Sequence, residues 1–96
     1  MPARDFYVIV YDIMDDRRRN KVARWLERHG ERVQYSVFEM YLTPEEWQRL
    51  WKHLARLIEP EEDSIRAYRL CAMCRQRIVH LGQGEPTPPP AAVMVL

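Results

Sequence analysis

The chain has 96 residues, which is enough for one small domain and too few for a doubly wound nucleotide-binding sheet or an eight-stranded α/β barrel. Its composition, 47% hydrophobic and 30% charged, is that of a globular protein, and two cysteines are too few for a disulfide-stapled miniprotein. No apolar run reaches the ~18 residues that cross a bilayer, and the N-terminus lacks the apolar core of a signal peptide. We therefore expect a cytoplasmic protein.

The net charge of +1 conceals two basic segments on either side of an acidic one. Residues 1–38 carry a charge of +2, residues 39–63 carry −4, and residues 64–82 carry +4. Charges act over a Debye length of about 10 Å, so the local balance decides which partners are attracted. A nearly neutral total therefore does not exclude a polyanionic partner.

The first predicted element is a strand over residues 5–11, in which β-branched and aromatic residues occupy both faces. This pattern predicts a strand that is buried on both sides and hence central in its sheet. The strand ends at Asp12, and Asp15 or Asp16 is expected to cap a helix that Gly30 stops from the C′ position. The apolar positions expected in this helix are Val22, Trp25, Leu26 and His29.

Residues 31–43 are strand-like throughout but too numerous for one typical strand of about 5–6 residues. We therefore predict two strands that meet near Tyr35 and Ser36, although no glycine marks a turn there. Two more strands are predicted further along the chain, at residues 64–71 and 77–81.

The second predicted helix has the clearest start signal of the sequence. Thr43 can serve as N-cap, Pro44 stands at the first helical position, and Glu46 completes a capping box. We expect the helix to end before Pro60 and to bury a single apolar stripe. That stripe consists of Trp47, Leu50, Trp51, Leu54, Leu57 and Ile58.

The order β-α-β-β-α-β, with a short extra C-terminal strand, predicts an α+β fold of the ferredoxin-like type. Its sheet is antiparallel, both helices cover one face, and the other face stays partly apolar, which favours a partner sheet. We expect this domain to span residues 1–82 and a Pro-rich C-terminal arm to span residues 83–96. The arm is interpreted either as a disordered tail or as a strand added to a neighbouring sheet edge.

Asp12 is the first candidate for chemistry because it lies where a buried strand exits, just before a helix. An aspartate at such a place is also common as a turn or capping residue. Asp15 and Asp16 add carboxylates close by, and Mg²⁺ binds through one or two carboxylates while keeping several waters. We interpret Asp12 as a Mg²⁺ ligand that needs a second carboxylate from across a twofold axis.

The first predicted helix is strongly basic. One interpretation is a solvated surface with ion pairs, for example Glu27 with Arg24 and Glu31 with Arg28. The other is a surface that binds the phosphate backbone of a duplex without reading its bases. The bases outnumber the two glutamates and are Arg17, Arg18, Arg19, Lys21, Arg24, Arg28 and Arg32.

Cys71 and Cys74 form a single C-x-x-C motif. A structural zinc site needs four ligands, and no helix is predicted to start here as a thioredoxin-like motif requires. We interpret the pair as reduced, semi-buried thiols at a strand end, with a zinc shared between two chains as the alternative. Since the sequence has neither a convincing Ser/His/Asp order nor a glycine-rich phosphate loop, metal-assisted hydrolysis is the remaining enzymatic interpretation.

Two segments together resemble the CRISPR-associated Cas2 family, the smaller of the two proteins that acquire new spacers. One is YVIVYDI at residues 7–13, followed by two aspartates and the basic helix. The other is GERVQYSVFE at residues 30–39, followed by Leu-Thr. The resemblance covers about residues 5–82, including the C-x-x-C segment, which similar members also contain.

The resemblance implies a homodimer in which Asp12 of both subunits meets across the axis as the catalytic, Mg²⁺-binding residue. Family members are described as metal-dependent endonucleases on RNA or double-stranded DNA, and as a non-catalytic bridge between integrase dimers. They also resemble toxin ribonucleases, so a free-standing toxin-like ribonuclease is a further alternative. We therefore expect a CRISPR adaptation protein with an integrase subunit and duplex DNA or RNA as partners. The other residues that the resemblance places in the active cleft are Tyr11, Arg19, Arg32, Ser36 and Phe38; Lys21 stands where some members have arginine.

Overall fold

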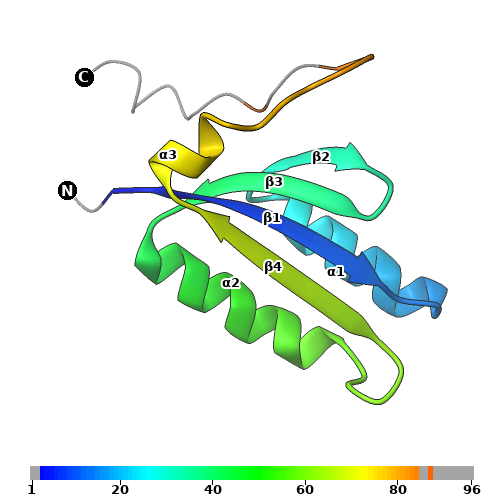
Figure 1. Ribbon diagram of the computed structural model, residues 1–96. Coiled ribbons are helices and arrows are strands. Elements are labelled where there is room, and N and C mark those ends of the chain that lie inside the picture. The colour runs from blue at the N-terminus through cyan, green and yellow to red at the C-terminus, as the bar shows by residue number, and fades with distance from the viewer. Residues whose placement is uncertain (1–2, 85–86, 88–96) are drawn as a thin grey trace.

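A four-stranded antiparallel sheet with the strand order β2-β3-β1-β4 organises the chain (Figure 1). The computed structural model describes residues 3–84 and 87. The predicted α+β, ferredoxin-like order of elements is confirmed. The strands are β1 (Asp5–Asp12), β2 (Glu31–Gln34), β3 (Val37–Leu42) and β4 (Ser64–Leu70), and the helices are α1 (Asp16–Glu27), α2 (Pro44–Leu57) and α3 (Ala72–Arg75).

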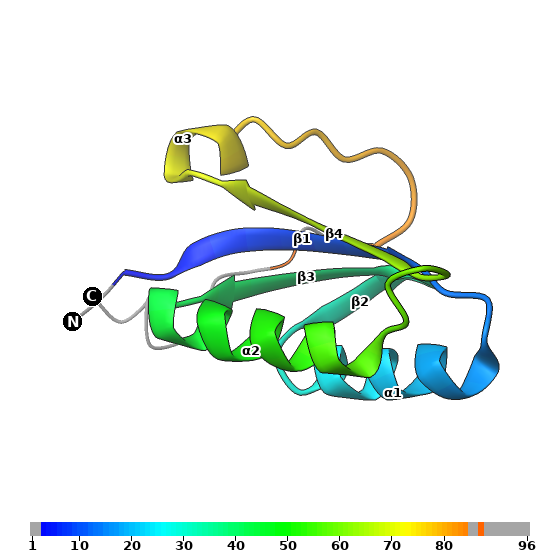
Figure 2. The same cartoon turned by 90° about the horizontal axis from the view of Figure 1, so that it is seen from below.

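The two long helices lie on the same face of the sheet, as predicted. Figure 2 shows α1 and α2 below the strands, whereas α3 and the segment after it lie on the opposite side, which we call the open face. Among the described residues, no helix is long and apolar enough to cross a membrane.

Strand β1 is central, because it pairs with β3 on one side and with β4 on the other. Its side chains alternate between the two faces, so Tyr7, Ile9 and Tyr11 point toward the helices and are buried. Val8 and Val10 point to the open face and are half-buried. Both faces of β1 are apolar because the side chains on each face are at least partly buried. The largest fully buried side chains of the core are Ile9, Val22, Leu26, Phe38, Met40, Leu42, Leu50 and Leu54.

The starts of both long helices are capped as the sequence predicts. The Asp15 side chain accepts a hydrogen bond of 2.9 Å from the backbone N–H of Arg18, at the start of α1. At the start of α2, Thr43 and Glu46 form a reciprocal capping box. Such caps satisfy N–H groups that have no partner within the helix. Helix α2 then ends at Leu57.

The interpretation of Gly30 as the C′ residue of the first helix is wrong. Helix α1 ends earlier, at Glu27 with Arg28 as C-cap, and Gly30 does not have a positive φ. A Cβ atom on Gly30 would lie 2.3 Å from the carbonyl oxygen of Glu39 and 2.5 Å from Cβ of Met40. Glycine is therefore required here because β3 passes so close to the backbone.

The long strand-like segment divides at Tyr35 and Ser36, as predicted, and these two residues form the turn between β2 and β3. The pairing register shifts between Arg32 and Gln34. This irregularity resembles a β-bulge, in which an extra residue bends one strand. It occurs in the edge strand β2, directly before a turn that has no Asn-Gly pair.

The predicted extra strand at residues 77–81 is wrong. The N–H groups of Arg77 and Ile78 donate to carbonyls of α3, at 3.0 and 3.2 Å, instead of to a neighbouring strand. Val79 and Leu81 follow with 91% and 96% of their surfaces exposed. The two interpretations of the C-terminal arm concern residues of which 85–86 and 88–96 lie outside the described part.

Candidate functional site

Asp12 is the last residue of β1 and pairs in register with Ser64 of β4. Its side chain is exposed and belongs to the same set of alternating positions as Val8 and Val10. Asp12 therefore lies at the end of the central strand and on the side of the open face.

The two neighbouring carboxylates are already engaged. Asp15 caps α1 through the N–H of Arg18, and Asp16 forms an ion pair with Arg19. Within residues 3–84 and 87, the structure contains no group of three His, Cys, Asp or Glu side chains that could hold a metal ion. One chain therefore offers the single carboxylate of Asp12.

Arg19 is fixed to the loop that follows Asp12. Its guanidinium donates hydrogen bonds of 3.1 and 3.2 Å to the carbonyl oxygens of Ile13 and Met14, which follow Asp12 in the chain. The ion pair with Asp16 holds the same guanidinium from the other side and raises the pKa of Arg19. These contacts tie the loop after β1 to the first turn of α1.

Tyr11, which precedes Asp12 in β1 and points to the face that the helices cover, forms a hydrogen-bonded group with Arg32 and Tyr35. The Tyr11 hydroxyl donates to the carbonyl oxygen of Tyr35 at 3.2 Å and accepts from Nη2 of Arg32 at 3.3 Å. Burial raises the pKa of Tyr11, so its hydroxyl stays protonated near neutral pH and can donate. Glu27 adds an ion pair to Arg32 at 3.5 Å. Arg32 also donates to the Tyr35 carbonyl oxygen, at 2.9 and 2.7 Å, so three groups align it.

Phe38 and Ser36 support this group. Phe38 is fully buried, with its ring centroid 6.2 Å from that of Tyr11 and 5.5 Å from the Arg32 guanidinium. Ser36 is half-buried, and its carbonyl oxygen accepts the backbone N–H of Tyr11 at 3.1 Å. In this chain Phe38 packs behind the site, and Ser36 joins the turn to the end of β1.

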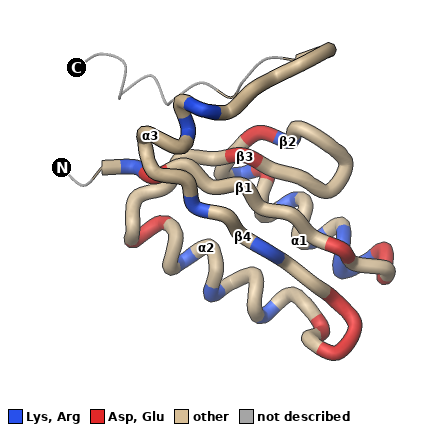
Figure 3. Tube along the Cα trace, in the orientation of Figure 1, with Lys and Arg blue, Asp and Glu red and all other residues tan. Residues whose placement is uncertain are grey.

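The bases of α1 have different partners. The Arg18 guanidinium donates to the buried carboxylate of Asp63, at 2.7 and 3.2 Å, and lies 3.6 Å from Glu62. Arg17 and Lys21 are exposed, and neither has an acidic partner among the described residues. Figure 3 shows that acidic residues gather in the loop between α2 and β4, with basic ones along α1 and β4. The cations available to a polyanion on α1 thus include Arg17 and Lys21, whereas Arg18 is engaged in the fold.

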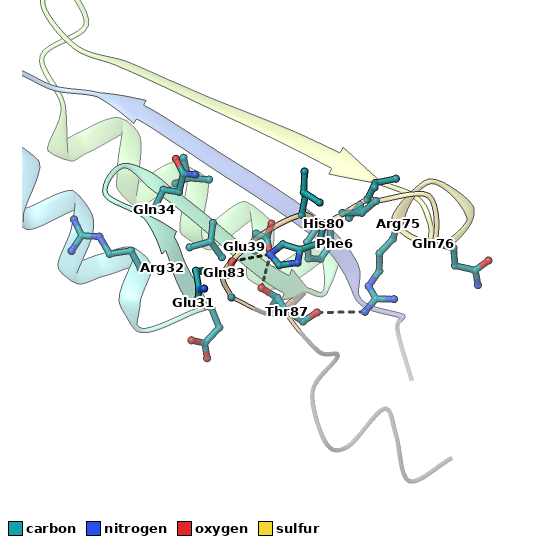
Figure 4. A pocket seen from close by; sticks show the side chains of 16 residues that line it. Phe6, Glu31, Arg32, Gln34, Glu39, Arg75, Gln76, His80, Gln83 and Thr87 are labelled. Carbon is teal, nitrogen blue, oxygen red and sulfur yellow. Dashed lines mark hydrogen bonds between the residues drawn. The ribbon is translucent and has the colours of Figure 1, made fainter.

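A groove of 870 Å³ lies between the open face and the segment after α3 (Figure 4). The Arg75 guanidinium lies 6.0 Å from the ring centroid of Phe6 and donates to the carbonyl oxygen of Thr87 at 3.4 Å. The Thr87 hydroxyl in turn donates to Glu39. Asp12 does not line this groove, whereas Arg32 does, so the groove and the candidate site share Arg32.

The C-x-x-C motif starts α3, so the expectation that no helix begins there is wrong. Both thiols are free and exposed, which also corrects the expectation of semi-buried side chains. Cys71 caps α3 and accepts the N–H of Cys74 at 3.4 Å, and this hydrogen bond lowers the pKa of the Cys71 thiol. The zinc shared between chains stays a prediction.

Known proteins with similar sequences and structures identify the family of the chain. The family model for CRISPR associated protein Cas2 matches residues 5–78. The chain belongs to this family. It is 46% identical to CRISPR-associated endoribonuclease Cas2 3 of Synechocystis, over 93% of this chain and 97% of the relative. The Cas2 crystal structure from Streptococcus pyogenes at pH 6.5 has a TM-score of 0.71 and 33% identity, covering 80% of this chain and 99% of that one.

A further Cas2-containing structure is described as a partial Cas6-RT-Cas1–Cas2 complex. The matched chain has a TM-score of 0.70 and 34% identity, with coverage of 85% of this chain and 88% of that chain.

The sequence pattern pointed to Asp12, Arg19 and Arg32, and the structure brings them to one end of β1. Two features were missed. The sequence pattern predicts Tyr35 only as part of a turn, although an aromatic residue at a turn without glycine is itself a signal. It also suggests Arg24 as the partner of Glu27, whereas in the structure Glu27 forms an ion pair with Arg32, across the link between α1 and β2.

Proposed function

We propose that this chain is a homodimeric CRISPR adaptation protein that binds duplex DNA or RNA and hydrolyses phosphodiester bonds with Mg²⁺. The observation that carries the proposal is the setting of Asp12. Arg19 is bonded to the residues directly after it, and Arg32 is bonded to Tyr11 directly before it. Two fixed guanidiniums at the end of the strand that carries the Asp12 carboxylate suit a phosphodiester, because such cations can hold phosphate oxygens.

The open face supports the dimer. Large apolar side chains remain exposed on this side of the molecule, among them Tyr68 at 50%, Met73 at 68% and Val79 at 91%. Exposed apolar area of this kind is typical of an interaction surface. Asp12 points to the same side, so two copies packed through their open faces would direct both carboxylates into one interface.

The residues of the site fit a Mg²⁺ ion bound between two chains, with Asp12 of each chain as a ligand. Mg²⁺ prefers oxygen ligands, binds through one or two carboxylates and keeps waters, and Asp12 is an exposed carboxylate of this kind. When bound there, the ion would polarise a phosphoryl oxygen and lower the pKa of a bound water. Arg19 and Arg32 would position the phosphate, and the neutral Tyr11 hydroxyl would keep Arg32 aligned.

The exposed bases of α1 support a nucleic-acid partner. Arg17 and Lys21 are available for phosphate contacts, which position a strand without reading its bases. Such binding weakens steeply with added salt and shows little preference for sequence.

A non-catalytic role as a bridge in the integrase complex is the second candidate. It is favoured because the described part of the chain offers one carboxylate, that of Asp12, at this site, and because the chain is similar to one solved in a complex with Cas1. On that basis, we propose an integrase subunit as the protein partner under either role.

The deciding experiment measures cleavage of RNA and of duplex DNA against Mg²⁺ concentration for the wild type, Asp12→Ala and Asp5→Ala. Asp5 lies at the opposite end of β1 and serves as the matched control. We expect Asp12→Ala to lose at least roughly 100-fold in rate, as for removal of a group that acts in the transition state, and Asp5→Ala to keep its rate.

Equal cleavage by the wild type and Asp12→Ala would contradict hydrolysis at this site and reveal a contaminating nuclease. Spacer acquisition measured with the same variants separates the two roles. Acquisition that survives in Asp12→Ala supports the bridge, whereas its loss in a folded dimer that still binds the integrase supports catalysis.

A further inference from the structure

Tyr35 is an aromatic side chain of which contacts within one chain bury only a small part. It lies in the turn between β2 and β3 with 66% of its surface exposed. Two-residue hairpin turns favour Asn, Asp and Gly, and an aromatic residue there gains little burial. A tyrosine at this position is therefore better explained by something that binds to it.

Two guanidinium groups border the Tyr35 ring. The Cζ atom of Arg32 lies 5.3 Å and that of Arg19 lies 5.8 Å from the ring centroid, within the range of cation–π contacts. Both guanidiniums are fixed by other bonds, Arg19 to the carbonyls of Ile13 and Met14 and Arg32 to the Tyr35 carbonyl. Since most of the Tyr35 surface stays exposed, the ring still has area for a further contact.

The backbone of Tyr35 is held firmly. Its carbonyl oxygen accepts hydrogen bonds from Nε and Nη2 of Arg32, at 2.9 and 2.7 Å, and from the Tyr11 hydroxyl at 3.2 Å. Only the side-chain torsions of Tyr35 remain to be ordered on binding, which keeps the entropic cost of a new contact small.

We propose that Tyr35 stacks on an unpaired nucleobase, with Arg19 and Arg32 bound to the phosphates beside that nucleotide. Aromatic side chains combined with cations are the features that bind single-stranded nucleic acid without sequence preference. A base inside a duplex has both faces covered by its neighbours and cannot reach the ring. The inference rests on the proposed function and narrows its substrate to strands that are single or unpaired at this site.

The test measures binding of a fluorescent single strand and of a blunt duplex of the same sequence to the full chain. Tyr35→Leu removes the ring but keeps apolar bulk, and Tyr35→Phe keeps the ring. We expect Tyr35→Leu to weaken single-strand binding roughly 5- to 100-fold while duplex binding stays within about twofold. Tyr35→Phe should match the wild type on both probes.

Met14→Ala is the matched control, because Met14 is 83% exposed in the neighbouring loop and has no aromatic face. A second readout uses short strands with 2-aminopurine at successive positions. Its fluorescence should be quenched at one position by the wild type and by Tyr35→Phe, and not by Tyr35→Leu. Met14→Ala should quench as the wild type does.

Two results would overturn the stacking role: unchanged single-strand binding in Tyr35→Leu, or an equal loss on both probes, which would mean that Tyr35 only positions Arg32. Failure of the proposed function looks different. In that case the wild type binds neither probe, and Arg17→Ala has no binding to reduce.

Discussion

At the scale of single residues, Arg18 shows that a cation in a basic run can serve the fold. The Asp63 side chain is 0% exposed and accepts two hydrogen bonds from Arg18 and one from the N–H of Glu59, at 2.8 Å. These bonds connect the start of α1 to the loop before β4. The Arg18 hydrogen bond is the first cause of the lowered pKa of Asp63.

Asp63→Asn should therefore destabilise the fold at neutral pH by about 1–3 kcal/mol, the usual cost of losing charged hydrogen bonds to a buried group. Because the pKa of Asp63 is lower in the folded state than its unfolded value of about 3.9, its stabilisation is complete above that value. It is lost as the pH falls through the folded pKa. Urea unfolding between neutral and acidic pH measures both effects.

Glu62→Gln is the control, because Glu62 is 68% exposed and its carboxylate lies 3.6 Å from Arg18. Exposed ion pairs of this kind contribute little, so its free energy of unfolding should change by less than about 1 kcal/mol. If the free energy of unfolding falls equally at acidic pH in Asp63→Asn and in the wild type, protonation of Asp63 is not linked to folding.

A single site residue could be predicted from the sequence only where its type and its place between two predicted elements both pointed to the site. Asp12 follows a buried strand and precedes a helix, so its place could be predicted. The different partners of Arg17, Arg18 and Arg19 could not be predicted, because Arg18 is bound by Asp63, which lies 45 residues away in the chain. The role proposed for Tyr35 could not be predicted either, because the two guanidiniums beside its ring come from different elements, α1 and β2.

At the scale of elements, the path from α1 into β2 depends on the close approach of Gly30 to β3. Gly30→Ala would place a methyl group 2.3 Å from the Glu39 carbonyl oxygen, and backbone cannot move aside as a flexible side chain can. We expect a loss of stability of at least about 1–3 kcal/mol, the cost of overpacking a well-packed site, measured by thermal or urea unfolding.

Gly82→Ala is the comparison for this change. Its new methyl group meets nothing within 4 Å, so the only cost is the backbone strain of a positive φ of 93°. We expect a loss of roughly 1–2 kcal/mol or less. Equal unfolding midpoints for Gly30→Ala and the wild type would contradict the packing argument.

The elements that local signals specify were predicted well. Alternating and continuous apolar patterns gave all four strands, and the capping box gave the start of α2. The false strand at residues 77–81 had the same local apolar pattern, but a strand also needs a hydrogen-bonding neighbour. Its first N–H groups bond back to α3, and no local pattern reveals that choice.

At the scale of the whole molecule, the open face predicts how two copies associate. Val79 is 91% exposed, so Val79→Asp should leave the fold of one chain intact but place a charge in the proposed interface. We expect at least about a tenfold weaker dimer, which corresponds to 1.4 kcal/mol or more. Sedimentation velocity over a dilution series measures it.

Ala55→Asp provides the matched charge on α2, on the opposite side of the sheet, where Ala55 is exposed. It should leave association unchanged. A dimer of equal strength in Val79→Asp and the wild type would show that the copies do not meet through this side.

Arg32 joins Glu27, Tyr11 and the Tyr35 carbonyl, and it is also one of the cations offered to a phosphate. A phosphate that binds Arg32 in place would add to these bonds and hold the hairpin tip more firmly at the end of β1, where Tyr11 also bonds to Tyr35 and Ser36. Strand β2 has only four residues, all of them exposed at the sheet margin. Phosphate binding at Arg32 would thus be detected away from Asp12, as slower amide hydrogen exchange along β2.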